Sequence, residues 1–162
     1  MSLLIAAALA ANAAQDAPSG HSLIDTALAT ILLVCTSAVR DKLDLNDEAA
    51  LARHGLVPID DESEAEMRRN RPGIEAALAR FPTATILVGR SPGGPCNTLI
   101  TGDGHAAVRE RLVSELTSHN FKSVRRDGPN YQDQVFDFGA AEISVRTMQG
   151  ANNVAVSVTL KE

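Results

Sequence analysis

The chain has very few aromatic side chains. Its 162 residues include no tryptophan, one tyrosine and four phenylalanines. Nucleobases and sugar rings are commonly held by stacking on aromatic rings, so this composition argues against recognition of either by stacking. Hydrophobic residues make up 44% of the chain and are mainly aliphatic. The sequence therefore predicts a globular protein with an aliphatic core.

Basic residues are outnumbered by acidic ones. The chain has 15 Lys and Arg against 20 Asp and Glu, a formal net charge of −5. A field of this sign repels phosphate polymers, so we expect no nucleic-acid partner. Lys122, Arg125 and Arg126 form a local basic group that could attract an anion, but such a group beside a turn is more commonly a solvated surface.

Long apolar runs are missing except at the N-terminus. Residues 3–11 are uncharged and apolar, and Ala11, Asn12 and Ala13 match the small-x-small pattern of a secretory cleavage site. We predict a signal peptide over residues 1–13, although no Lys or Arg precedes the run, and a periplasmic or secreted mature protein. The alternative is an Ala-rich helix of the folded domain, which would need burial on every side.

No membrane span is expected, because the apolar runs over residues 3–11 and 27–34 are both too short to cross a bilayer. Residues 14–21 include Pro18, Ser19 and Gly20 and are expected to form a flexible lead-in. Residues 22–162 are expected to form a single α+β domain, which is long enough to bury about two thirds of the surface of the unfolded chain. The domain shows no internal sequence repeat.

Helix signals dominate the first half of that domain. Ser22 can cap a helix whose apolar residues recur at three- and four-residue steps as far as residue 38. Residues 47–55 favour a short helix, and residues 60–71 place acids first and bases last, as the helix dipole prefers. One more helical piece is expected within residues 72–81. The acids lack the spacing of a calcium loop, so no metal site is predicted.

Strand signals dominate the second half. Residues 83–88 and 96–101 favour a hairpin around the turn-rich segment 89–95, and Asp103 can cap a helix over residues 104–119. Three further strands are expected over residues 134–138, 142–148 and 154–160. The predicted fold class is therefore α+β, with a helical N-terminal half followed by an antiparallel sheet of about five strands and one long helix packed on one face.

The two cysteines, Cys35 and Cys96, are predicted to form a disulfide, because an exported chain with two cysteines normally pairs them. The alternatives are two buried free thiols of a cytoplasmic protein, or Cys96 as a nucleophile with a histidine base. The spacing of the histidines gives no support to this dyad.

Candidate site residues are few. The loop residues Arg90, Ser91, Gly93 and Gly94 are candidates for binding, although their loop lacks the Lys and Ser/Thr of a phosphate loop. His105, near Asp103, is the candidate general acid or base. No serine elbow, zinc motif or redox motif is present.

These observations favour a small exported protein that binds or assembles in the cell envelope without catalysis. We expect no cofactor, a protein or small molecule as partner, and the polar sheet face or the loop over residues 89–95 as the contact surface. The alternative is a small hydrolase or isomerase that uses His105 with a nearby carboxylate.

The leader predicts a measurable loss of mass. Protein isolated from the envelope fraction should lack about the first 13 residues, because signal peptidase removes the apolar run after its small-x-small site. Intact-mass spectrometry checks this. Full-length protein recovered from the cytoplasm would contradict export.

Overall fold

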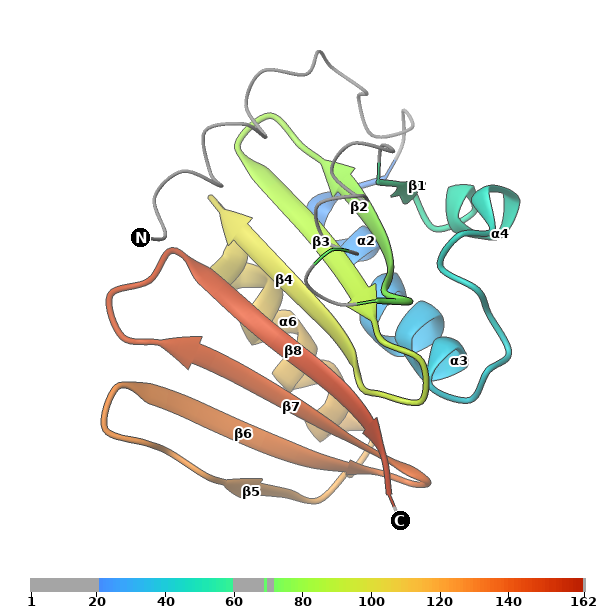
Figure 1. Cartoon of the computed structure of the whole chain (residues 1–162). Helices are drawn as coiled ribbons and strands as arrows, with labels where there is room; N and C mark the ends of the chain where they lie inside the picture. The colour runs from blue at the N-terminus through green and yellow to red at the C-terminus, as the bar shows by residue number, and fades with distance from the viewer. Residues whose placement is uncertain (1–20, 60–68, 70–71, 162) are drawn as a thin grey trace.

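The structure is a computed structural model that describes residues 21–59, 69 and 72–161 (Figure 1). The predicted signal peptide and most of the lead-in lie outside the described residues. So does the helix expected over residues 60–71, apart from residue 69.

One antiparallel sheet of eight strands forms the centre of the fold, in the order β1-β2-β3-β4-β8-β7-β6-β5. The strands are β1 Val57–Pro58, β2 Glu75–Arg80, β3 Ala84–Arg90, β4 Cys96–Gly102, β5 Ser123–Arg125, β6 Tyr131–Phe138, β7 Ala141–Met148 and β8 Asn153–Leu160. Two meanders, β1 to β4 and β5 to β8, therefore meet where β4 pairs antiparallel with β8.

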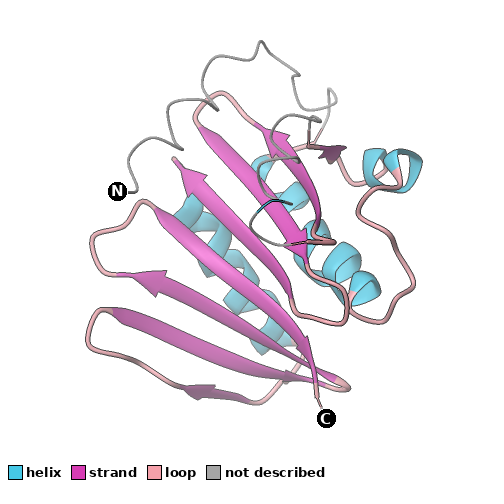
Figure 2. Ribbon diagram, viewed as in Figure 1, coloured by secondary structure: helices cyan, strands magenta, loops and turns pink. Residues whose placement is uncertain are grey.

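Two helical segments cover the same face of this sheet (Figure 2). The first joins α2 (Leu23–Ala29), the π-helical η1 (Thr30–Cys35) and α3 (Thr36–Ala38). The second is α6 (His105–Ser118), and the short α4 (Glu48–Ala52) contacts β1. Both η1 and α6 contact the central strands β4 and β8, so the opposite face of these strands carries no helix among the described residues.

The predicted proportions of the fold were wrong. The N-terminal half is not mainly helical, and the sheet has eight strands rather than about five. The expected helix within residues 72–81 is the strand β2, and β1 and β5 were missed. The β2 sequence EAALAR favours a helix by propensity. In the fold, Ala77 and Ala79 of β2 are buried in the main core, and this tertiary burial overrides the local preference.

The start of α6 also differs from the prediction. Asp103 makes no capping hydrogen bond, and the N-cap is Gly104 in the left-handed region at φ 88°. A Cβ at Gly104 would lie 2.9 Å from a methyl group of Leu23. The helix therefore begins where a glycine permits a tight turn against α2, rather than where a carboxylate is available.

The topology repeats although the sequence does not. Each half of the chain runs from a helical segment into a four-stranded meander, and each meander ends with a central strand, β4 or β8. Because β4 and β8 are antiparallel, the two halves are related by an approximate two-fold axis between these strands. Hydrophobic burial can be satisfied by many aliphatic sequences, so a repeated fold needs no repeated sequence.

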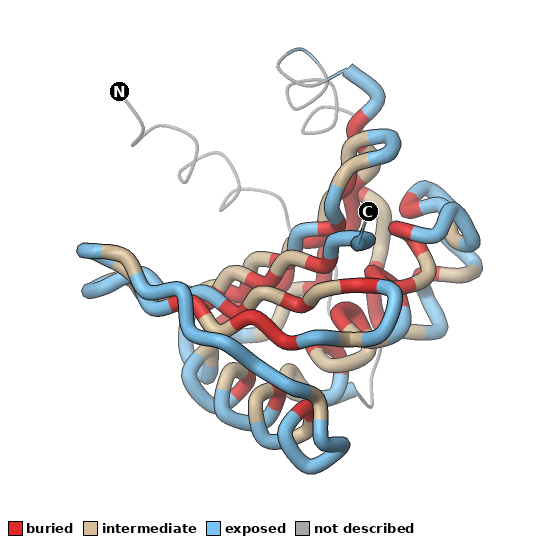
Figure 3. The backbone as a smooth tube through the Cα atoms, turned by 90° about the horizontal axis from the view of Figure 1, so that it is seen from below, coloured by how far each residue is buried: buried red, intermediate tan, exposed pale blue. Residues whose placement is uncertain are grey.

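The main core lies between the sheet and its helices and is largely aliphatic, as composition predicted. Along β8, Val154, Val156 and Val158 are buried, whereas Ala155 and Ser157 are only partly covered. Figure 3 shows the same alternation of buried and partly buried positions along the central strands. This period of two divides each strand between the helix-covered face and the open face.

The predicted disulfide between Cys35 and Cys96 is confirmed. It joins the end of η1 to the start of β4, and both cysteines are fully buried. Beside it, Arg90 places Nη2 2.9 Å from a carboxylate oxygen of Asp41, and Nε 3.9 Å from one of Glu75. One covalent bond and one charged cluster thus hold the first helical segment, and the loop after it, on the sheet.

Substitutions on the two faces of β8 should have unequal effects. Val156→Asp places a charge in the buried layer and should lower the free energy of unfolding by several kcal/mol. Ser157→Asp, on the open face, should cost about 1 kcal/mol or less. Urea denaturation of both variants measures this difference. Equal shifts of the midpoint would contradict the observed register.

Reduction of the disulfide should destabilise the protein. Cys35 and Cys96 are 61 positions apart in the sequence. Loss of this cross-link raises the conformational entropy of the unfolded chain, which should lower the free energy of unfolding by about 4 kcal/mol. Thiol counting on unfolded, unreduced protein should find no reactive thiol, and reduction should lower Tm. Two reactive thiols in protein isolated without reductant would contradict the bond in solution.

Candidate functional site

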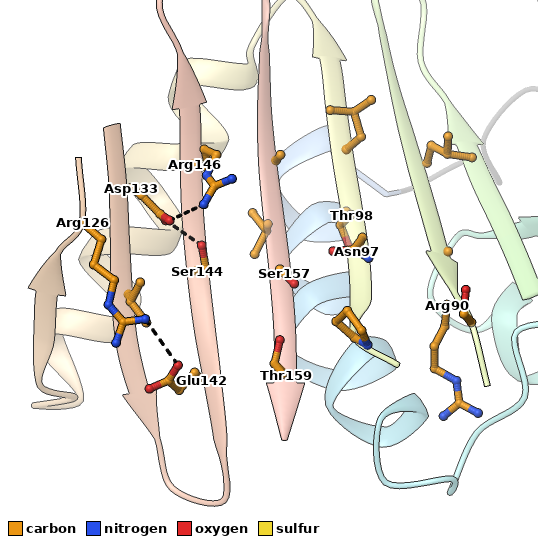
Figure 4. A pocket seen from close by; sticks show the side chains of 18 of the residues that line it. Arg90, Asn97, Thr98, Arg126, Asp133, Glu142, Ser144, Arg146, Ser157 and Thr159 are labelled. Atoms are coloured by element: carbon orange, nitrogen blue, oxygen red, sulfur yellow. Dashed lines mark hydrogen bonds and ion pairs between the residues drawn. The ribbon is translucent and has the colours of Figure 1, made fainter. Parts of the chain in front are cut away.

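An open cavity of about 690 Å³ lies on the face of the sheet opposite η1 and α6, within the size range of small-ligand sites (Figure 4). Its walls come from β3, β4, β8, β7 and β6, together with the turn between β3 and β4. It therefore spans the junction of the two meanders. We call this cavity the trough.

Strand register aligns two rows of side chains across the open face. The first row contains the cross-strand partners Val57, Leu78, Leu87, Leu99, Ala155, Arg146 and Asp133. The second row contains Ala76, Gly89, Asn97, Ser157, Ser144, Val135 and Val124. Because neighbouring strands lie about 4.8 Å apart, each row forms a line of closely spaced side chains perpendicular to the strands.

Small residues of the second row form the floor of the trough. Gly89, Ser144 and Ser157 all line the cavity. A Cβ at Gly89 would meet its nearest neighbours at 3.6 Å or more, and the backbone there is not in the left-handed region. Nothing in the backbone requires a glycine at this position. Its effect is to leave the floor open.

The side chains that line the trough change from aliphatic at one end to charged at the other. At the β3–β4 end, Ile74, Leu87 and Leu99 present aliphatic side chains, and at the β6–β7 end the lining is charged. Asn97 and Ser157 are cross-strand partners on the central strands β4 and β8, and they lie in the second row, beside Leu99 and Ala155 of the first. Neither the Asn97 nor the Ser157 side chain makes a hydrogen bond within the described part of the chain, so both are available to a ligand.

A fixed ionic network forms the charged end. Arg146 Nη2 donates to Asp133 Oδ2 at 2.7 Å, and Ser144 Oγ donates to Asp133 Oδ1 at 2.6 Å. The Asp133 side chain is 5% exposed, whereas that of Arg146 is 44% exposed. The hydrogen bond with Asp133 raises the pKa of Arg146 above its usual value. The buried carboxylate is thus satisfied internally, and the cation is left facing outward.

Two further contacts shape this end. The guanidinium carbon of Arg146 lies 4.5 Å from the centre of the Tyr131 ring, a cation–π contact. Arg126 and Glu142, both on the rim, approach each other at 3.9 Å. Arg146 is therefore oriented by a carboxylate and by an aromatic ring, whereas the Arg126–Glu142 pair is looser and more exposed.

Only two of the candidate site residues predicted from the sequence lie at the trough. Arg90 and Ser91 line the trough, whereas Gly93 and Gly94 lie in the same turn without lining it. His105 does not line the trough. Its Nδ1 is 2.9 Å from the backbone oxygen of Gly102, and it makes no hydrogen bond or ion pair with a carboxylate among the described residues.

Sequence reasoning pointed to Arg126 at the charged end but missed Asp133, Glu142, Ser144 and Arg146. Alternation in β7 could have placed Glu142, Ser144 and Arg146 on one polar face. It could not have placed Asp133 beside them, because that contact depends on the pairing of β6 with β7 in the register Asp133 to Arg146.

No described helix is long and apolar enough to cross a membrane. Across residues 21–59, 69 and 72–161, no three His, Cys, Asp or Glu side chains gather as a metal site. The chain matches no protein-family model, no curated protein and no solved structure. The functional argument therefore depends on the geometry of the trough.

Removal of the Arg146 side chain should destabilise the fold through Asp133. Arg146→Leu leaves the buried carboxylate with Ser144 as its remaining side-chain partner and should cost about 1–3 kcal/mol, less than a fully buried pair because the arginine is half exposed. Adding Asp133→Asn should recover part of this loss, because the buried charge is then gone.

A matched surface pair provides the control. Arg111 lies 3.4 Å from Glu115 on α6, where its side chain is 60% exposed, and Arg111→Leu should change the free energy of unfolding by about 0.5 kcal/mol or less. Chemical denaturation of the variants tests both statements. Equal losses for the Arg146 and Arg111 variants would show that the Asp133 network adds no stability.

Proposed function

We propose that this protein is a non-catalytic binding module of the cell envelope, exported by its N-terminal leader, and that the trough is its contact surface. One observation carries the proposal: a concave site on the open sheet face combines an aliphatic wall with the polar side chains of Asn97 and Ser157, which have no hydrogen-bond partner among the described residues. Ligand sites typically join apolar walls to a few converging polar groups in this way.

The rigidity of the trough supports a binding role. Its floor consists of paired strands, and the opposite face of the two central strands, β4 and β8, is packed against η1 and α6. The Cys35–Cys96 disulfide adds a covalent tie at the end of β4 that borders the trough. A preformed surface loses little conformational entropy when a ligand binds, which favours affinity.

The lining chemistry also favours binding over catalysis. The residues that line the trough include no histidine and no cysteine. The Asp133 carboxylate, which lines the trough, is already engaged by Ser144 and Arg146. A general base must be free to take a proton from a substrate, and this carboxylate is used within the protein instead.

A location in the envelope is supported by the disulfide, because such bonds persist in oxidising compartments. The apolar run and small-x-small site at the N-terminus supply the route of export.

Site-specific photo-crosslinking in the producing cells tests the proposal. A benzoylphenylalanine in place of Ser157, on the trough floor, should give a discrete adduct after illumination. The same group in place of Glu110, exposed on α6, should give none. Gly89→Val fills the floor without backbone strain and should abolish the Ser157 adduct. Absence of an adduct at Ser157, or equal adducts at both positions, would contradict a binding role for the trough.

A further inference from the structure

We propose that the ligand of the trough is an extended peptide that crosses the strands, with an aliphatic side chain at the β3–β4 end and an acidic side chain four residues away at Arg146. This inference rests on the proposed binding function and adds the chemistry of the ligand. It follows from three properties of the trough: the polar side chains of Asn97 and Ser157, which have no partner in the described part of the chain, the length of the trough and the exposed charge of Arg146.

The centre of the trough favours a peptide over other occupants. An acyl chain laid over Asn97 and Ser157 would remove their polar groups from water without replacing the lost hydrogen bonds, which is costly. A peptide backbone supplies both donors and acceptors at this point. Sugars and nucleobases would find few stacking partners, because no aromatic residue lines the trough.

The length of the trough sets the spacing of the two anchors. Leu87 on β3 and Arg146 on β7 belong to one row and are separated by the strands β4 and β8. Three strand spacings amount to about 14 Å, and an extended peptide rises about 3.4 Å per residue, so the anchors lie about four residues apart. An even spacing places both side chains on the same side of an extended peptide, facing the sheet.

The Asp133–Arg146 pair exposes its cation, and the rim pair Arg126–Glu142 beside it carries one charge of each sign. Both oxygens of Asp133 accept hydrogen bonds, from Ser144 and from Arg146, and its side chain is 5% exposed. Arg146 is 44% exposed, and Figure 4 shows its other terminal nitrogen directed toward β8 and the trough. Its orientation is set before a ligand arrives, by Asp133 and by the Tyr131 ring. A carboxylate matches this donor in charge and in geometry.

Titration of isotope-labelled protein with capped pentapeptides, followed by NMR chemical shifts, tests the inference. The reference probe is acetyl-Leu-Ser-Ala-Ser-Glu-amide. It should shift the backbone signals of Leu99, Ser157 and Arg146, and should bind about tenfold more tightly than the probe ending in Gln, because one charge-assisted hydrogen bond is lost. The probe Leu-Ser-Ala-Glu-Ser, whose acid faces the other way, should bind no better than the Gln probe.

Protein variants test the assigned contact. Arg146→Gln should reduce binding of the Glu probe to the level of the Gln probe and leave the Gln probe unchanged, with the folded spectrum as a check on structure. Arg111→Gln, on α6, should change neither. Because the peptide series is measured on the unaltered protein, the inference stays testable even if the Arg146 variant fails to fold.

The outcomes separate this inference from the proposed function. Equal or tighter binding of a Lys-ended probe would overturn the assignment of an acidic side chain at Arg146, and shifts confined to residues outside the trough would overturn the peptide assignment. So would the absence of any shift with all probes while the Ser157 crosslink forms in cells, and in that case the binding function would stand. Absence of both the shifts and the crosslink would overturn the two together.

Discussion

The antiparallel pairing of β4 with β8 is the contact on which the rest of the structure depends. It joins the only two meanders among the described residues into one sheet and makes a single open face out of two halves that are far apart in sequence. Leu99 and Asn97 of the first meander thereby become neighbours of Ala155 and Ser157 of the second. Both rows of the trough pass through this junction, so a change in its register would separate the aliphatic end from the charged end.

The two faces of the sheet have separate physical roles. The helix-covered face buries the aliphatic side chains that supply most of the hydrophobic stabilisation. The Cys35–Cys96 bond joins the helical layer to the sheet on this face. The open face is thereby left free to carry polar groups that a closed core would exclude. Asp133 combines features of both faces, because it lies on the open face but is buried. Its carboxylate therefore needs the hydrogen bonds from Ser144 and Arg146.

The trough is polarised because the meanders bring different residues to the common face. The first meander supplies Leu87 and Leu99, and the second supplies Ser144, Arg146 and Asp133. The proposed peptide would place its aliphatic and acidic side chains against these two ends. The approximate two-fold relation of the halves explains the position of the site, which lies across the axis, and the sequence difference between the halves explains its polarity.

Several features were determined by the sequence alone, because they depend on composition or on near neighbours in the chain. Scarce aromatics predicted an aliphatic core, two cysteines predicted one disulfide, and the alternation from Val154 to Val158 predicted the two faces of β8. The tertiary structure alone decided that the helix-favouring β2 is a strand and that Asp133 meets Arg146. Both outcomes come from pairing between strands. The energies of this pairing and of the burial that it creates depend on residues far apart in the chain, so no local stretch of sequence can predict them.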